Sequence, residues 1–174
     1  MTSAATVASF DVQAEPLRLQ LAVRLAEMGE LPPAWAPAVE RVRRHRFVPG
    51  FYLLASQPGQ DGLPVGEPVT PAIDPARWLA AVYSDQTLIT QFDNDEPDWS
   101  DPAPRTGGVA TSSATLPSLV VRMWHDAGLE PGMRILEVGT GTGYSTALAC
   151  ERLGSRAITS VEVDQRRLGQ VAAS

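Results

Sequence analysis

Apolar residues early in the chain recur at the spacing of a helix. Leu17, Leu21, Leu25 and Met28 follow one another at intervals of four, four and three residues, so their side chains fall on one face. Gly29 comes directly after this stripe, in the position where glycine commonly ends a helix. The pattern therefore predicts a helix that packs on a core along one side.

The rest of the N-terminal region is interrupted by loops. A second helix is expected over residues 34–44, entered through two prolines. Glycine, proline and acidic residues are frequent in residues 57–75 and 93–108, which are expected to be long loops. Between these loops, residues 78–92 are expected to hold a short helix and a strand. The sequence thus predicts a mainly helical region with long loops over residues 1–110.

Farther along the chain, short apolar segments alternate with helical ones. Helices are expected over residues 116–127 and 144–153, with a buried strand over 134–138 and a second strand over 157–163. A strand, a glycine-rich turn, a helix and a strand form a βαβ unit whose strands run parallel. The sequence therefore predicts an α/β protein in which residues 111–174 form the first βαβ part of a Rossmann-like domain.

Charge and composition exclude several classes of protein. The formal net charge of −6 argues against binding to nucleic acid or to an anionic membrane through bulk electrostatics. Residues 41–46 are basic, and they are expected to be the solvated end of a helix rather than a phosphate-binding patch. No apolar run reaches the length of a membrane span, and the N-terminus lacks the basic and apolar regions of a secretory signal. We therefore expect a cytoplasmic protein without nucleic-acid or membrane partners.

The cysteine and the histidines give no sign of a metal site. Cys150 is the only cysteine, so neither an intrachain disulfide nor a cysteine-based zinc site can form. It lies in an apolar run and is expected to be a buried, unreactive thiol. His45 and His125 have no partners at metal-ligand spacing.

A glycine-rich turn carries the clearest chemical signal. Gly139, Gly141 and Gly143 alternate after the first strand of the βαβ unit, where a missing Cβ lets the backbone approach a ligand. A dinucleotide-binding turn has its third glycine one residue later, where this chain has Tyr144. The G-x-G-x-G spacing, with Glu137 two positions before it, resembles motif I of the methyltransferases that use S-adenosylmethionine (SAM). The resemblance implies that the turn passes beside the methionine and adenosine parts of SAM.

An acidic residue ends the second strand of the same unit. Glu162 lies about twenty residues beyond the turn, where a carboxylate can accept hydrogen bonds from both hydroxyls of a ribose. Asp164 is on the same side of the extended chain, and we expect Glu162 to bind the ribose and Asp164 to cap a following helix. The alternative is that the glycines only make a tight turn. Glu137, the glycines and Glu162 together on one unit favour a cofactor site.

Other segments narrow the resemblance. Ser113, Thr115 and Pro117 stand at the Thr, Ser and Pro of a Thr-Ile-Ser-x-Pro segment that precedes the same helix in the protein-L-isoaspartate O-methyltransferases. Residues 42–49 (VRRHRFVP) are similar to a Val-Pro-Arg-x-x-Phe-Val-Pro element of that family, and residues 83–88 (YSDQTL) to its Tyr-x-Asp-x-x-Leu stretch. The chain thus resembles this family over most of its length, interrupted by the two long loops.

The resemblance implies a SAM-dependent O-methyltransferase that acts on an aspartyl or isoaspartyl carboxylate of a protein or peptide. The hydroxyl of Thr115 would orient the substrate carboxylate with Ser113 beside it, so these two are the catalytic candidates. A carboxylate with a pKa of about 4 is already ionised at neutral pH, and no general base is needed. The alternative is that Ser112, Ser113 and Thr115 cap the helix that follows.

Departures from the family bear on the substrate. Thr111 and Ser112 replace its Gly-Gln pair, and the insertion over residues 93–108 lies directly upstream. Substrate access is therefore expected to differ from the family's. Repair of damaged proteins and tailoring of a ribosomally made peptide, as in similar actinobacterial relatives, both remain open.

The chain stops one helix after the second strand, before the Asp-Gly element of the family's third strand. We expect a homodimer or a partner that supplies the missing half of the fold, and no turnover by the isolated monomer. A non-catalytic fragment or assembly module is the first alternative. An NAD-dependent oxidoreductase is disfavoured by Tyr144 in the third-glycine position.

Overall fold

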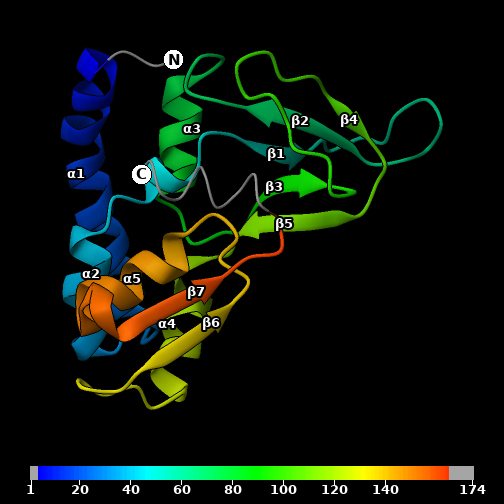
Figure 1. Ribbon diagram of the computed structural model, residues 1–174. Coiled ribbons are helices and arrows are strands. Elements are labelled where there is room, and N and C mark those ends of the chain that lie inside the picture. The colour runs from blue at the N-terminus through cyan, green and yellow to red at the C-terminus, as the bar shows by residue number, and fades with distance from the viewer. Residues whose placement is uncertain (1–3, 165–174) are drawn as a thin grey trace.

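The computed structural model describes residues 4–164, in which helices and strands are mixed along the chain (Figure 1). The helices are α1 (Ala4–Glu27), α2 (Ala36–Arg41), α3 (Pro75–Val82), α4 (Pro117–Asp126) and α5 (Tyr144–Leu153), with short 3-10 helices η1 (Pro33–Trp35), η2 (Arg44–Phe47) and η3 (Ser155–Ala157). The strands are β1 (Phe51–Leu54), β2 (Val65–Val69), β3 (Leu88–Phe92), β4 (Arg105–Thr106), β5 (Ala110–Ala114), β6 (Ile135–Val138) and β7 (Ile158–Val161). The helix expected after Asp164 lies outside the described residues.

Helix α1 packs on the core through its apolar stripe. Leu21 and Leu25 are fully buried, which confirms the predicted buried face. The helix ends at Glu27, two residues before Gly29, whose φ of 76° is left-handed, and the Glu30 amide donates to the Leu25 carbonyl at 2.8 Å. Met28 is 63% exposed because the chain is already leaving the helix there, so including Met28 in the buried stripe is wrong.

The helix expected over residues 34–44 is shorter than predicted. Helix α2 ends at Arg41 because Val42 has an extended backbone, with φ −69° and ψ 123°. In the 3-10 helix η2 that follows, Arg44 and His45 are buried. The interpretation of this basic run as a solvated helix end is therefore wrong for these two residues, because interior carbonyls and a carboxylate supply their hydrogen-bond partners.

A five-stranded antiparallel sheet occupies the middle of the chain, in the order β4-β2-β1-β3-β5 (Figure 1). Strand β3 lies where the sequence predicts a strand. The other strands are not predicted: β2 lies within residues 57–75 and β4 within residues 93–108, both expected to be loops. The N-terminal region thus contains the expected helices together with this sheet. The glycine and proline of β2 hide the strand, because both residues usually weaken one.

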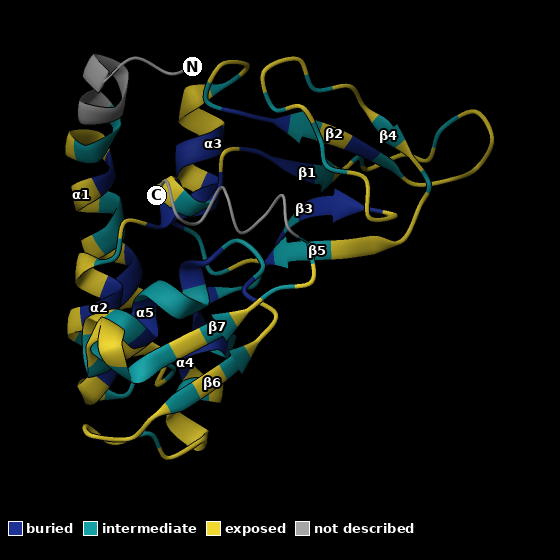
Figure 2. Cartoon of the chain, viewed as in Figure 1, coloured by how far each residue is buried: buried dark blue, intermediate teal, exposed yellow. Residues whose placement is uncertain are grey.

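The βαβ unit follows the prediction closely. Strands β6 and β7 pair in parallel from Ile135 opposite Ile158 onward, and α5 spans the predicted residues 144–153. Strand β6 is not buried on both faces, however, because Leu136 and Val138 are 64% and 79% exposed. Alternate residues of β6 and β7 are accordingly exposed in Figure 2. The expectation of a buried strand is wrong for this face.

One hydrophobic core joins the N-terminal helices, the antiparallel sheet and the βαβ unit. Its fully buried side chains include Leu21, Trp35, Phe51, Val82, Leu88, Val121 and Leu148. Strand β5 begins at Ala110 and crosses the predicted domain boundary between residues 110 and 111, which stays a prediction. Among the described residues, no helix combines the length and apolarity that a membrane crossing requires.

Candidate cofactor and acceptor site

The glycine turn adopts a backbone that only glycine takes readily. Gly139, Gly141 and Gly143 have φ angles of 90°, 55° and 90°. The Gly139 amide donates to the Val161 carbonyl at 2.8 Å, which fastens the turn to the end of β7. A Cβ on Gly139 or Gly141 would meet no atom of the described chain within 4 Å. The left-handed backbone, and not crowding by the protein, therefore requires these glycines.

Glu162 lies against this turn at the carboxyl end of β7. Its Oε2 accepts a hydrogen bond from the Gly141 amide at 2.8 Å, and its Oε1 accepts from the amides of Val163 at 2.8 Å and Asp164 at 3.2 Å. Ligands of open parallel sheets bind at the carboxyl ends of the strands. Glu162 and the turn are thus brought together as the sequence indicates, and the contact with a ribose stays a prediction.

Glu137 joins three elements close to the turn through hydrogen bonds. Its Oε2 accepts from the hydroxyl of Ser160 in β7 at 2.7 Å and from that of Thr146 in α5. The Ser160 hydroxyl also lies 2.7 Å from the hydroxyl of Thr140 in the turn. These bonds hold β6, β7 and α5 in place around the glycines, while a direct contact of Glu137 with a cofactor stays a prediction.

Cys150 lies half-buried on α5 near this network. Burial, together with the negative charge of Glu137, raises the pKa of its thiol. A thiol of raised pKa is a poor nucleophile at neutral pH. This agrees with the expected unreactive thiol, although the side chain is less buried than predicted.

The acceptor candidates Ser113 and Thr115 lie at the end of β5. Ser113 pairs with Ile89 of β3, and Ala114 between the two candidates points into the core. Within residues 4–164, no hydrogen bond engages the hydroxyl of Ser113 or Thr115. Both residues are half-buried, and their hydroxyls are left without a partner within this part of the chain.

Helix α4 takes its N-terminal caps from elsewhere in the chain. The Asp85 carboxylate accepts from the Ser118 amide at 2.9 Å, and the Thr87 hydroxyl accepts from the Leu116 amide at 3.2 Å. The alternative that Ser112, Ser113 and Thr115 cap this helix is therefore wrong, because Leu116 stands at its N-cap position and no side chain there bonds to the helix. Asp85 and Thr87 were visible in the YSDQTL segment, but the segment alone does not reveal their role.

Gln91 connects the antiparallel sheet to the βαβ unit. This buried side chain accepts from the Thr111 hydroxyl at 3.1 Å and donates to the carboxylates of Glu96 at 3.3 Å and Asp164 at 3.4 Å. Asp164 follows Glu162 by two residues. The contact places the β3–β5 side of the sheet next to the candidate ribose-binding end of β7.

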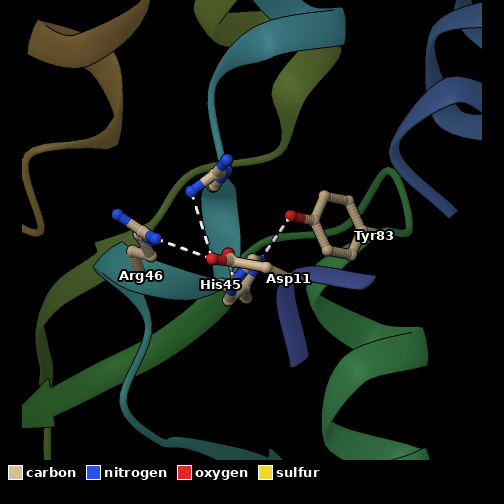
Figure 3. A network of polar contacts seen from close by, with 5 residues as sticks. Asp11, His45, Arg46 and Tyr83 are labelled. Atoms are coloured by element: carbon tan, nitrogen blue, oxygen red, sulfur yellow. Dashed lines mark hydrogen bonds and ion pairs between the residues drawn. The ribbon is translucent and has the colours of Figure 1, made fainter. Parts of the chain in front are cut away.

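A buried histidine fastens α1 to η2, as Figure 3 shows. His45 is hydrogen-bonded through Nδ1 to the Tyr83 hydroxyl at 2.7 Å and through Nε2 to the Asp11 carboxylate at 3.0 Å. Arg46 and Arg43 donate to the other oxygen of Asp11 at 2.7 and 3.1 Å. Burial lowers the pKa of His45, although the nearby carboxylate acts in the opposite direction. These partners give His45 a role in holding the helix in place.

Comparison with known proteins connects this geometry to a family. A family model described as protein-L-isoaspartate(D-aspartate) O-methyltransferase matches residues 79–172, more than half of the chain. A protein-L-isoaspartate O-methyltransferase of Thermotoga maritima is 32% identical over 89 residues, which are 51% of this chain and 24% of that protein. A solved structure titled protein-L-isoaspartate O-methyltransferase covers 90% of this chain, with 24% identity and a TM-score of 0.58. The match covers 37% of that solved chain, so this chain spans well under half the length of both relatives. The structural likeness confirms the predicted methyltransferase fold.

Proposed function

Because the chain belongs to the protein-L-isoaspartate(D-aspartate) O-methyltransferase family, we propose that it serves SAM-dependent methylation of an aspartyl or isoaspartyl carboxylate in a protein or peptide. The observation that carries this proposal is the left-handed glycine turn with the Glu162 carboxylate on the Gly141 amide. Both lie at the carboxyl end of a parallel strand pair, the usual position of a nucleotide-like ligand.

The chain's own residues have a modest chemical task. SAM supplies a methyl group on a positively charged sulfur, and a substrate carboxylate with a pKa of about 4 is already the nucleophile at neutral pH. The protein has to hold the carboxylate in line with that methyl group and exclude water. We assign the orientation of the carboxylate to the hydroxyl of Thr115, with Ser113 beside it. Their hydroxyls are free of other bonds within the described part of the chain, which supports the assignment.

Two substrate classes fit this proposal, a damaged protein that carries isoaspartate and a peptide that is modified during its synthesis. The insertion upstream of β5 is an ordered extension: β4 pairs with β2, and Arg105 is bonded to Asp93 at 3.0 Å and to Asp95 at 2.9 Å. The insertion therefore has a defined structure. It lies directly upstream of Thr111 and Ser112, which replace the family's Gly-Gln pair. Methyl transfer to an isoaspartyl peptide and to the matching aspartyl peptide separates the two classes. Preference for the isoaspartyl peptide supports repair, and preference for the aspartyl peptide supports peptide modification.

Calorimetry with SAM, its demethylated product S-adenosylhomocysteine and NAD tests the cofactor. We expect SAM and its product to bind and NAD to bind more weakly. Glu162→Ala should weaken SAM binding by about 1.5–3 kcal/mol, the usual loss for a charged hydrogen-bond partner. Glu67→Ala, an equal change of charge at an exposed position of β2, is the control and should bind SAM as the wild type does. Tighter binding of NAD, or unchanged SAM binding by the Glu162 variant, would refute the assignment.

A non-catalytic assembly module is the second candidate, favoured by one observation. The apolar residues on one face of β6, β7 and the segment after β7 are exposed, and these are Leu136, Val138, Val161 and Val163. Parallel sheets normally have both faces covered. We propose that a second copy of this chain or a partner protein covers this face, in either functional case.

A further inference from the structure

The Arg44 guanidinium donates hydrogen bonds to backbone carbonyls of two segments that are distant from it in sequence. Nη1 donates to the carbonyls of Val82 at 2.8 Å and Ser84 at 3.1 Å. Nη2 donates to those of Gln86 at 3.2 Å, Ala114 at 3.1 Å and Thr115 at 3.0 Å. The side chain is fully buried and makes no carboxylate ion pair among the described residues.

This arrangement compensates a buried charge with dipoles. An isolated buried cation is costly unless its donors are engaged, and the planar fork engages five carbonyls through Nη1 and Nη2, while Nε has no hydrogen-bond partner among the described residues. Val82 ends α3, where unpaired carbonyls carry the negative end of the helix dipole. The Tyr144 ring adds a further favourable contact, with its centroid 5.3 Å from the guanidinium carbon.

The partners of Arg44 are the segments that carry the candidate site. The segment after α3 contains Asp85 and Thr87, which cap α4, and the acceptor candidate Thr115 directly follows β5. Tyr144 directly follows the last glycine of the turn and begins α5. One side chain therefore contacts the acceptor strand, the capping segment and the helix that starts at the cofactor turn.

We propose that Arg44 is a positioning residue that holds the Thr115 backbone in a fixed place relative to the glycine turn. We call the contacts of Arg44 with the backbone carbonyls the clamp. The inference rests on the proposed function, because methyl transfer is what requires Thr115 to be held in place. Arg44 fixes the Thr115 backbone and leaves the Thr115 hydroxyl for the substrate carboxylate. A single ammonium group has no fork and cannot span both segments, so lysine should not replace it.

The test compares wild type, Arg44→Lys and the matched control Arg43→Lys, in which an exposed arginine of the same run pairs with Asp11. The measurements are amide hydrogen exchange, affinity for S-adenosylhomocysteine and, in the associated or complemented form that turns over, methyl transfer to an isoaspartyl peptide. We expect Arg44→Lys to speed exchange at least tenfold at residues 82–87 and 113–118. We also expect at least a tenfold loss of kcat/KM for the peptide with less than a threefold change in S-adenosylhomocysteine affinity. Arg43→Lys should match wild type in all three.

Two results for Arg44→Lys would overturn the inference. The first is that Arg44→Lys shows the same amide exchange and the same kcat/KM as wild type. The second is that Arg44→Lys loses S-adenosylhomocysteine affinity and kcat/KM for the peptide to the same extent and exchanges faster throughout the chain, which indicates general structural damage. If Arg44→Lys does not fold, exchange in the wild type decides. The amides of Leu116 and Ser118 should then exchange only through global unfolding, and fast local opening there would refute the clamp. A wild type that binds no S-adenosylhomocysteine refutes the proposed function instead, and the exchange data still judge the clamp.

Discussion

At the residue scale, the backbone of Thr115 is held by another residue, and its side-chain hydroxyl is not. Arg44 holds the carbonyl, while no hydrogen bond within residues 4–164 involves the hydroxyl. Removing the hydroxyl should therefore leave the local backbone intact. We expect Thr115→Ala to lower kcat for methyl transfer by about 10- to 100-fold, the cost of about 1.5–3 kcal/mol for a hydrogen bond to a charged group.

Radiolabelled methyl transfer to an isoaspartyl peptide measures this effect, in the associated or complemented form of the chain that turns over. SAM affinity should stay within about twofold of wild type, a shift of well under 1 kcal/mol, because the hydroxyl is assigned to the acceptor and not to the cofactor. Thr115→Ser keeps a hydroxyl and should retain much of the activity. Equal kcat in wild type and Thr115→Ala would remove Thr115 from the catalytic assignment.

His45 makes stability depend on pH. Burial lowers its pKa below the ordinary value of 6.5, so the folded chain resists protonation of this imidazole. As pH falls below 6.5, the unfolded chain takes up a proton that the folded chain does not, and the free energy of unfolding decreases. For one proton the slope is at most about 1.4 kcal/mol per pH unit.

Urea unfolding between about pH 5 and pH 7 measures this slope. His45→Gln should flatten it, although the variant is less stable at neutral pH because it disturbs the bonds to Asp11 and Tyr83. His125→Gln, at an exposed position in the last turn of α4, should keep the wild-type slope. An unchanged slope in His45→Gln would assign the pH dependence to other groups.

The buried positions of Arg44 and His45 could not be predicted from their own segment. The basic run of residues 41–46 has the composition of a solvated surface. The hydrogen-bond partners that allow Arg44 and His45 to be buried lie far away in sequence. The carbonyls that Arg44 binds are 38 to 71 residues distant, and Asp11 precedes His45 by 34 residues. Burial of charge was decided by tertiary partners that no local pattern reveals.

At the scale of elements, the start of α4 depends on a cap from another segment. The Asp85 carboxylate accepts from the Ser118 amide at 2.9 Å in the first turn, where a negative charge also interacts favourably with the helix dipole. Asp85→Ala should lower the free energy of unfolding by about 1 kcal/mol. Denaturant unfolding checks this, with Asp101→Ala at an exposed position as the control. Equal stability of the Asp85 variant and wild type would show that the bond contributes nothing.

The elements differ in how far the sequence determines them. Helix α5 was predicted residue by residue because Gly143 and Gly154, with φ of 90° and 89°, mark its two ends. The glycines, Glu137 and Glu162 of the candidate site follow from the same local pattern. The antiparallel sheet does not follow from the local pattern, because β2 contains glycine and proline and β4 spans only two residues. These strands depend on tertiary pairing, of β2 with β1 and of β4 with β2.

At the scale of the whole molecule, the parallel strand pair exposes a row of apolar side chains to solvent, which is unfavourable for a chain without a partner. Leu136 and Val138 on β6 are more than half exposed, and Val163 after β7 is 97% exposed. Burial of such side chains contributes roughly 1.5–3 kcal/mol each. The net charge of −6 opposes association only weakly at physiological ionic strength, where charges are screened beyond about 8 Å.

We therefore expect the chain to self-associate or to bind a partner through this face. Replacing Leu136 and Val138 with glutamine and threonine should weaken self-association at least tenfold, equivalent to about 1.4 kcal/mol. Light scattering over a series of concentrations measures the change. Leu63→Gln with Val109→Thr removes a similar pair of exposed apolar side chains from the antiparallel sheet region and should leave association unchanged. If the wild type stays monomeric at high concentration and captures no partner, or if both double variants weaken association equally, this face is not an interface.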